Sequence, residues 1–263
     1  MQLSNIETHT PWFIPDQFKG KSSAGAYGDA VVCLDYLVGR IMDHIKKLKI
    51  ENNTLIVYQA DNGPLVWEYP ELRNCYGEYS NVDQERGQNR YLRDGKYQAF
   101  YEGGPKVSAA AYFPGVIPAG KTCDEIIAGF DWFTTFIHLS GGKIPQDRPI
   151  DGKDISNLLL GKKDAHSPHD HILLFASYPG VCGVRKGQWK LTVRKEKEKE
   201  KLELYDLTVD PKEQKNISAD HPEVVEELYA LYEKGRKEIP GRNDPSHPQR
   251  RNGMGIWQEK KGE

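Results

Sequence analysis

Several features are scarce or absent in this chain of 263 residues, and each absence argues against a class of protein or a type of segment. No apolar run approaches the roughly 20 residues of a membrane-spanning helix, so we expect no membrane span. The formal net charge is −2, so the chain lacks the basic field typical of nucleic-acid binding. Residues 1–7 carry neither a basic start nor an apolar core, and as they stand we expect no signal peptide there. The sequence leaves the cellular location and the oligomeric state open.

Cysteine is also sparse, and its spacing excludes a common metal motif. The four cysteines are Cys33, Cys75, Cys123 and Cys182, with no C-x-x-C pair among them. This spacing disfavours a zinc site. Cys33 lies on the apolar stripe of a predicted helix, where a packed thiol is expected. Whether the four cysteines form two disulfides depends on the compartment and stays open.

One stretch organises the first half of the chain. Residues 54–60 are mostly apolar and β-branched, a pattern typical of a strand buried on both faces. Asp61 and Asn62 follow it, and Gly63-Pro64 then forces a turn. Ligands bind beyond the carboxyl ends of the strands in open parallel sheets, and side-chain oxygens suit Ca²⁺ or Mg²⁺. A local turn made by the Asp side chain is the alternative interpretation.

A long helix precedes this strand. Residues 24–49 place apolar side chains three and four positions apart, which predicts one buried face. The stripe consists of Val31, Leu34, Val38, Ile41, Ile45 and Leu48. A helix followed by a buried strand is half of a βαβ unit, so the fold class is α/β. One helix and one strand cannot make such a sheet, and we expect the central strand to lack a neighbour on at least one side.

Two basic residues stand in loop sequence. His9 lies two residues before Pro11, and Lys96 lies between Gly95 and an aromatic run. A lysine held in such a loop can serve as a fixed charge for an oxyanion, although most lysines are surface charges. Residues 65–95 interleave aromatic and arginine side chains, and such a long loop forms either a wall for an anionic, sugar-like substrate or an insertion packed on its own aromatics.

The second half has a different composition. Residues 162–171 are rich in His, Asp, Ser and Pro, which indicates a domain boundary, and the histidines at 166, 169 and 171 are interpreted as linker residues and not as a metal site. Strands are predicted at 172–176, 181–185, 189–194 and 202–207, with a solvated hairpin extension at 195–201. A closing helix is predicted at 222–237, which gives an antiparallel sheet packed against one helix. Residues from 240 onward are expected to be loosely ordered.

Taken in order, the short motifs closely resemble the carboxyl-terminal half of the arylsulfatase family. These are the formylglycine-dependent sulfatases of the alkaline-phosphatase-like superfamily, and the resemblance covers roughly residues 8–235. The motifs that carry it are His9-Thr10-Pro11, Tyr27-Gly28-Asp29, Asp35, Val38-Gly39, Asn53-Thr54-Leu55, Asp61-Asn62-Gly63-Pro64, Gly95-Lys96, Tyr101-Glu102-Gly103-Gly104, Phe113-Pro114-Gly115, Asp151-Gly152, Leu204-Tyr205-Asp206-Leu207, Asp210-Pro211 and Gln214-Lys215-Asn216.

The resemblance implies a domain plan and a set of site residues. Residues 1–165 would form the carboxyl-terminal part of the catalytic α/β domain, 166–240 a small antiparallel-sheet subdomain, and 241–263 a loose tail. Asp61 and Asn62 would ligate Ca²⁺, while His9 and Lys96 would bind the sulfate ester and act in catalysis. The implied substrate is a sulfated small molecule or sulfated sugar. A cation and a lysine neutralise sulfate oxygens in the transition state, and a histidine can donate a proton to the leaving oxygen.

The chain also departs from the family pattern. The family's nucleophile is a formylglycine made from cysteine in a Cys-x-Pro/Ala-x-Arg motif, and none of the four cysteines has it; in Cys182-Gly183-Val184-Arg185 the arginine comes one residue early. The paired aspartates that complete the family's metal site are absent as well. Two residues cannot supply the six to eight oxygens that Ca²⁺ usually takes. We therefore expect a fragment of a sulfatase. The alternatives are a non-catalytic remnant that serves as a binding or structural module, and a phosphoryl or phosphonate hydrolase of the same superfamily.

Residues 1–263 alone are expected to hydrolyse no sulfate ester, because they lack the nucleophile motif and half of the metal ligands. Incubation of the purified chain with an aryl sulfate and Ca²⁺ tests this expectation. Turnover that disappears in the Lys96→Ala variant would contradict it.

Overall fold

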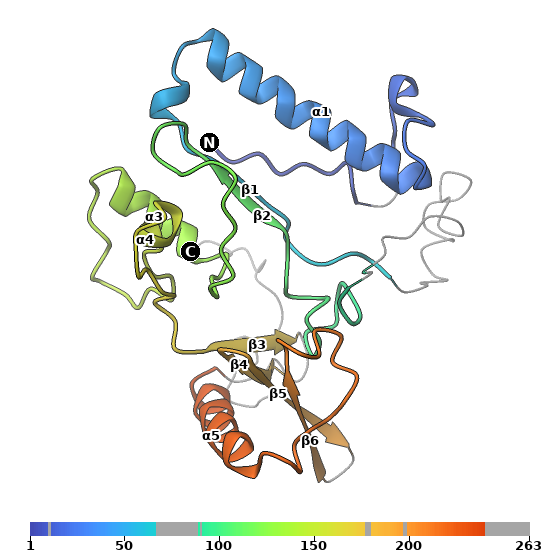
Figure 1. The fold of residues 1–263 in the computed structure, drawn as a ribbon, viewed down its shortest axis with the longest axis vertical. Helices are drawn as coiled ribbons and strands as arrows, with labels where there is room; N and C mark the ends of the chain where they lie inside the picture. The colour runs from blue at the N-terminus through green and yellow to red at the C-terminus, as the bar shows by residue number, and fades with distance from the viewer. Residues whose placement is uncertain (10–11, 67–88, 90, 177–179, 197–198, 240–263) are drawn as a thin grey trace, which may run out of the picture.

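The structure is a computed structural model that describes residues 1–9, 12–66, 89, 91–176, 180–196 and 199–239. Figure 1 shows a long helix and a two-stranded ribbon at one end, two shorter helices beside them, and a four-stranded sheet with one helix at the other end. Most of the aromatic loop, Cys75 and the predicted carboxyl-terminal tail from residue 240 lie outside the described residues. The expected domain boundary at residue 165 stays a prediction.

The predicted long helix is confirmed as α1, which spans Gly25–Lys47. The chain enters it through a short 3-10 turn, η1, at Asp16–Phe18. Asp29 is buried in the first turns of α1, and its carboxylate accepts the backbone N–H groups of Gly20 and Ser22 at 2.6 and 2.7 Å. Burial alone would raise the pKa of Asp29. The hydrogen bonds from the backbone N–H groups lower it by more, so the pKa of Asp29 lies below its usual value.

The central strand is present but is not part of a parallel sheet in the described chain. A second short turn, η2, at Glu51–Asn53 precedes it. Strand β1, Ile56–Gln59, pairs antiparallel with β2, Ala109–Tyr112. Beyond the two strands the segments continue to run in opposite directions beside each other. Ala60 donates its N–H to the carbonyl oxygen of Ser108, and Gly63 donates its N–H to that of Gly104.

The burial expected for this strand was wrong. Tyr58 on β1 and Tyr112 on β2 are each 38% exposed, whereas a strand covered on both faces was predicted. Among the described residues the sheet has only these two strands. The expectation that the central strand lacks a neighbour on at least one side is therefore confirmed for the described part of the chain.

The apolar stripe of α1 is only partly covered. Leu34, Val38, Ile41 and Ile45 are half-buried, while Val31 and Leu48 are 41% and 54% exposed. The predicted burial of the whole stripe was thus too extensive, because a two-stranded ribbon is too narrow to cover a helix of 23 residues. No helix in the described part of the chain has the length and apolar character to cross a membrane.

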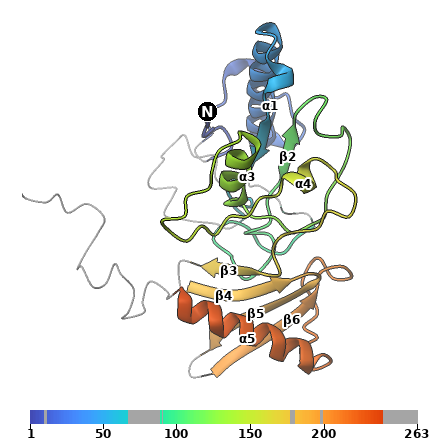
Figure 2. The ribbon, with the colours of Figure 1, turned by 90° about the vertical axis from the view of Figure 1, so that its left-hand side faces the viewer.

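The second half matches the predicted order of elements closely. Strands β3 (Ile172–Ala176), β4 (Gly180–Lys186), β5 (Trp189–Glu196) and β6 (Lys199–Asp206) form an antiparallel sheet in that order. Helix α5, Pro222–Glu238, lies across one face of the sheet (Figure 2). The predicted hairpin extension is confirmed by the pairs Lys195–Glu200 and Glu196–Lys199, with residues 197–198 outside the described chain.

The two faces of this sheet differ in kind, because alternate residues of a strand point to opposite faces. One face packs on α5 and forms an apolar core. That core consists of Val181, Val184, Leu191, Val193, Leu204, Leu228 and Tyr232. The other face carries polar and charged side chains that are nonetheless buried, among them Lys190, Thr192 and Glu203. Something other than α5 must therefore cover this second face.

Two short helices lie beside the ribbon (Figure 1). Helix α3 spans Asp131–Leu139 and α4 spans Ser156–Leu159. The apolar run from Ile126 to Leu139 predicts a helix over its whole length, and the observed helix begins five residues later, at Asp131. The reason is that a carboxylate oxygen of Asp131 accepts the N–H of Ala128 at 2.7 Å and so holds the preceding residues in a turn.

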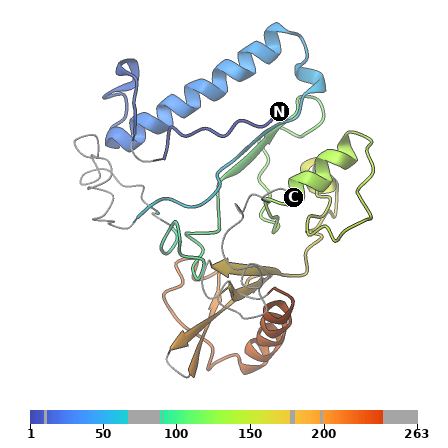
Figure 3. The same cartoon turned by 180° about the vertical axis from the view of Figure 1, so that it is seen from behind.

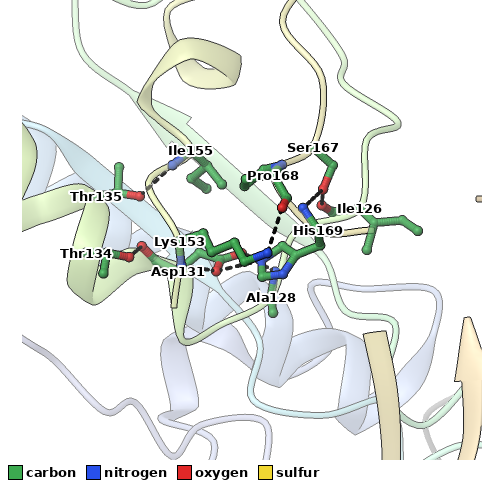
Figure 4. Close-up of polar contacts among 10 residues, drawn as sticks. All are labelled: Ile126, Ala128, Asp131, Thr134, Thr135, Lys153, Ile155, Ser167, Pro168 and His169. Atoms are coloured by element: carbon green, nitrogen blue, oxygen red, sulfur yellow. Dashed lines mark hydrogen bonds and ion pairs between the residues drawn. The ribbon is translucent and has the colours of Figure 1, made fainter. Parts of the chain in front are cut away.

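Asp131 organises the connection between the two halves, as Figure 4 shows. Its fully buried carboxylate also accepts the N–H of Lys153 at 2.9 Å and lies 2.8 Å from Nε2 of His169. The neighbouring histidines have their own carboxylates, Glu125 for His166 and Asp170 for His171. Among the described residues no group of three or more His, Cys, Asp or Glu side chains forms a metal site. The three histidines therefore act as contacts of the linker, each with a separate acid.

The Asp131→Asn variant is expected to lower the free energy of unfolding by about 1–3 kcal/mol, the cost of leaving a buried N–H without its acceptor. Asparagine keeps one side-chain oxygen, but Ala128 and Lys153 donate to different oxygens of Asp131. Urea unfolding measures the change. Asp147→Asn is the control, because Asp147 lies in an exposed pair with Arg148, and its effect should stay within about 0.5 kcal/mol. Equal effects of the two variants would refute the account.

Candidate functional site

The predicted metal residues stand directly beyond β1, where the chain leaves the ribbon. Asp61 is exposed, and its Oδ1 accepts the N–H of Asn62 at 2.9 Å. The Asn62 side-chain amide donates to the carbonyl oxygen of Gly63 at 2.8 Å. Both side chains are therefore engaged in the turn itself, through one carboxylate oxygen of Asp61 and the amide nitrogen of Asn62.

A seam of glycines presses the next loop, residues 93–104, against this turn. A Cβ on Gly63 would collide with the carbonyl oxygen of Gly103, and a Cβ on Gly95 would collide with that of Pro64. Across the seam, Gly63 donates its N–H to Gly104 at 2.9 Å and Lys96 donates to Pro64 at 2.8 Å. Only glycine allows two backbones to approach this closely. The Asp61-Asn62 turn and the Lys96 loop therefore form one assembly.

Lys96 lies in a tightly constrained turn of that loop. Its neighbours Asp94 and Tyr97 both adopt positive φ, at 60° and 71°, a region that residues other than glycine seldom occupy. The Lys96 side chain is half-buried, and Nζ lies 5.4 Å from the centre of the Tyr97 ring. Unfavourable backbone conformations persist where the surrounding structure imposes them and are concentrated at functional sites.

His9 occupies a different segment. It lies in an exposed turn near the start of the chain, where its backbone N–H donates to Ile6 at 2.9 Å. Residues 10–11 of its motif lie outside the described chain. The structure thus brings Asp61, Asn62 and Lys96 into one assembly, and the role of His9 stays a prediction.

The chemistry of the described residues fits a metal in part and a formylglycine not at all. Asp61 and Asn62 supply oxygen ligands of the type that Ca²⁺ takes, but a full site needs more of them. Cys182 is fully buried in β4, its thiol donates to the carbonyl of Leu174 at 3.4 Å, and burial raises its pKa to about 12. Nucleophilic cysteines need a low pKa and access, so Cys182 is a packing residue. Cys33 is buried and Cys123 exposed, and both are free thiols.

A buried ionic cluster, which the sequence did not reveal, supports the Lys96 loop from behind. Lys190 on β5 is fully buried, with Nζ 3.1 Å from Glu102 and 2.8 Å from Glu213. Arg185 on β4 adds a 2.8 Å bond to Glu102. A lysine in an alternating strand pattern ordinarily predicts a solvent-facing side chain. The only sequence signal was Glu102 itself, within the Tyr101-Glu102-Gly103-Gly104 motif.

A cavity of about 510 Å³ opens where the loop meets the sheet. Glu102 and Arg185 form part of its wall, together with Lys106 and Asp124 from the segment that leads away from the loop. The β4–β5 turn contributes Gly187 and Gln188, and the segment after β6 contributes Leu207 and Thr208. Lys190 is therefore sealed from solvent, whereas Glu102 and Arg185 line the open cavity and Arg185 is partly exposed.

Two family models match the chain. The Sulfatase model matches residues 1–142, and the model for the carboxyl-terminal part of N-sulphoglucosamine sulphohydrolase matches residues 87–238. Human steryl-sulfatase is 37% identical over 173 residues, which cover 66% of this chain and 27% of that protein. An N-acetylgalactosamine-6-O-sulfatase from Bacteroides thetaiotaomicron is 28% identical over 245 residues, which cover 89% of this chain and 46% of that protein.

Solved structures agree. A structure described in connection with the metabolism of multiple glycosaminoglycans by Bacteroides thetaiotaomicron superposes with a TM-score of 0.70 at 27% identity, covering 89% of this chain and 49% of that one. A sulfatase from Pseudoalteromonas sp. has the same fold, with a TM-score of 0.68 at 22% identity over 87% of this chain and 46% of that one. The chain spans less than half the length of these relatives. It belongs to the sulfatase family, and its α/β fold is that of the carboxyl-terminal region of these enzymes.

Proposed function

We propose that the chain supplies the Lys96 loop and two of the Ca²⁺ ligands of a sulfatase that hydrolyses a sulfate ester of a sugar. The observation that carries the proposal is the glycine seam, which ties the Lys96 backbone to Pro64 three residues after Asp61. The seam supports the proposal because it joins the backbone of Lys96 to the turn that follows Asp61 and Asn62. Such an arrangement suits an anion that binds to a lysine and a metal ion together.

The residues of the chain divide this work by their chemistry. Asp61 and Asn62 would hold Ca²⁺, which supplies positive charge beside the sulfate oxygens when it is bound. Lys96 would place a second positive charge on those oxygens from the opposite side of the seam, where its turn restricts its movement. His9 would donate a proton to the leaving oxygen of the ester. The nucleophile is a formylglycine in this family, and no cysteine of the chain is suited to become one.

A sulfated sugar is the substrate class that the comparisons favour. The relative that covers 89% of the chain is named an N-acetylgalactosamine-6-O-sulfatase. A further structure of the same fold, at 24% identity and a TM-score of 0.57, is described in complex with its substrate D-glucosamine-2-N,6-O-disulfate. These names describe those proteins, and for this chain the sugar ester is part of the proposal.

Lys96→Ala is expected to lower kcat by about 10²- to 10³-fold, as for the loss of one oxyanion donor, and to leave Ca²⁺ affinity unchanged. Asp61→Ala should weaken Ca²⁺ binding and activity together. The measurements are kcat on 4-nitrophenyl sulfate and Ca²⁺ affinity by calorimetry, in a sulfatase that joins residues 1–263 to a segment carrying the formylglycine and the remaining metal ligands.

Lys121→Ala is a matched control. Lys121 also follows a glycine, Gly120, in an exposed turn with positive φ, so its loss removes the same charge from the same type of loop. It should leave both quantities unchanged. Wild-type kcat in Lys96→Ala would refute the assignment of Lys96, whatever the Asp61 result.

A further inference from the structure

The polar face of the β3–β6 sheet, opposite α5, presents a row of side chains to the Lys96 loop. Arg185 on β4 pairs with Lys190 on β5, and Lys190 pairs with Tyr205 on β6, so the three lie side by side across the sheet. Lys190 and Tyr205 are at most 1% exposed. Because α5 covers the other face, the cover for this row has to come from elsewhere in the chain.

Residues 101 and 102 of the Lys96 loop provide that cover. Tyr101 packs edge-on against Tyr205, with ring centres 6.4 Å apart. Glu102 lies 3.1 Å from Nζ of Lys190 and 2.8 Å from the Arg185 guanidinium. In Figures 1 and 3 this part of the chain lies between the β1–β2 ribbon and the sheet.

Glu213, in the segment after β6, closes the cluster from the far side. Its carboxylate pairs with Lys190 at 2.8 Å and accepts the backbone N–H of Glu102 at 2.7 Å. Its own backbone carbonyl accepts the Arg93 guanidinium at 2.7 Å. The loop is thus held at both ends, at Arg93 and at Glu102, and Lys96 lies between these two points.

The electrostatics make this arrangement sensitive to each member. Glu102 and Glu213 are both buried, and Lys190 is the shared cation between them. Burial raises the pKa of Glu213 even though Lys190 opposes that shift. A buried ion pair contributes little net stability to the folded state. Removing one partner is nevertheless destabilising, because it leaves the other partner as a buried charge with no opposite charge beside it. The main effect of such a cluster is therefore to favour the one arrangement of loop and sheet in which every charge is paired, and its contribution to net stability is small.

We propose that Glu102, Lys190 and Glu213 are positioning residues for the sulfate-binding loop: they fix the segment from Arg93 to Gly104 on the sheet, and the glycine seam passes that position on to Lys96 and the Asp61-Asn62 turn. The carboxyl-terminal sheet thereby becomes a part of the active-site framework. This inference rests on the proposed function for the role of Lys96, while the fixing of the loop is a property of the chain itself.

Glu102→Gln is the variant of choice, because it keeps the size of the side chain and leaves the Lys190–Glu213 pair inside the sheet. Hydrogen exchange of residues 1–263 reports the result without any need for activity. The amides of Gly63, Lys96 and Gly103, which bond across the seam and the loop, should exchange at least tenfold faster in the variant. Amides of β5 should be unchanged, which shows that the sheet remains folded.

Glu227→Gln is the matched control. It removes the same charge from Glu227 on α5, which forms an exposed pair with Lys186 at the end of β4, and it should leave the loop amides at wild-type rates. Loop exchange in Glu102→Gln within twofold of the wild type would overturn the inference. Faster exchange throughout β5 as well would also overturn it, because the cluster would then serve the stability of the sheet and not the position of the loop.

The same sulfatase, with residues 1–263 joined to a segment carrying the formylglycine and the remaining metal ligands, adds a second readout. Glu102→Gln should lower kcat on 4-nitrophenyl sulfate about tenfold or more, and in the Lys96→Ala background it should cause no further loss, because it acts through Lys96. Lys190→Arg should retain more activity than Lys190→Met, since it keeps the buried cation. Independent, multiplicative losses would overturn the positioning role. Faster loop exchange in a preparation without any sulfatase activity would refute the proposed function and leave the fixed loop standing.

Discussion

A buried ammonium group, Nζ of Lys190, pairs with two carboxylates that arrive from different parts of the chain, and Arg185 adds a second positive charge beside one of them, Glu102. Glu102 comes from the loop that follows the aromatic segment, and Glu213 comes from the turn after the last strand. Because an isolated charge in the interior is costly, the loop can occupy only the position in which both pairs form. The glycine seam joins this same loop to the turn that follows Asp61 and Asn62, through the bonds Gly63–Gly104 and Lys96–Pro64.

Local patterns in the sequence predicted the elements well and their burial poorly. The periodicity of α1, the alternation of β3 to β6 and the closing helix α5 are encoded within short windows, and each was found within a few residues of its observed bounds. The β1–β2 pairing was missed because it is set by the return of the chain through Gly63 and Gly104. The stripe on α1 was predicted as buried because periodicity reports which face is apolar and not what covers it.

The candidate site divides in the same way. Asp61, Asn62 and Lys96 could be found from the sequence because each sits at a motif with a strand end or a glycine beside it. The supporting cluster could not, because Lys190 and Glu102 are far apart in the chain and each looks like a surface charge in its own window. Only the covering of the polar sheet face by the Lys96 loop turns Lys190 into an interior residue. Cys182 was excluded as the nucleophile by the spacing of its motif, and the fold adds a second reason, because the thiol is buried in β4 and burial raises its pKa.

The coupling between Glu102 and Lys190 tests the account most directly. A double-mutant cycle with Glu102→Gln and Lys190→Met, read by urea unfolding of residues 1–263, isolates the interaction between loop and sheet from the stability of either. We expect a coupling free energy of about 1–3 kcal/mol, the range for residues in one buried ionic network. Additive effects, within about 0.3–0.5 kcal/mol, would mean that the loop does not depend on the cluster and would contradict the account.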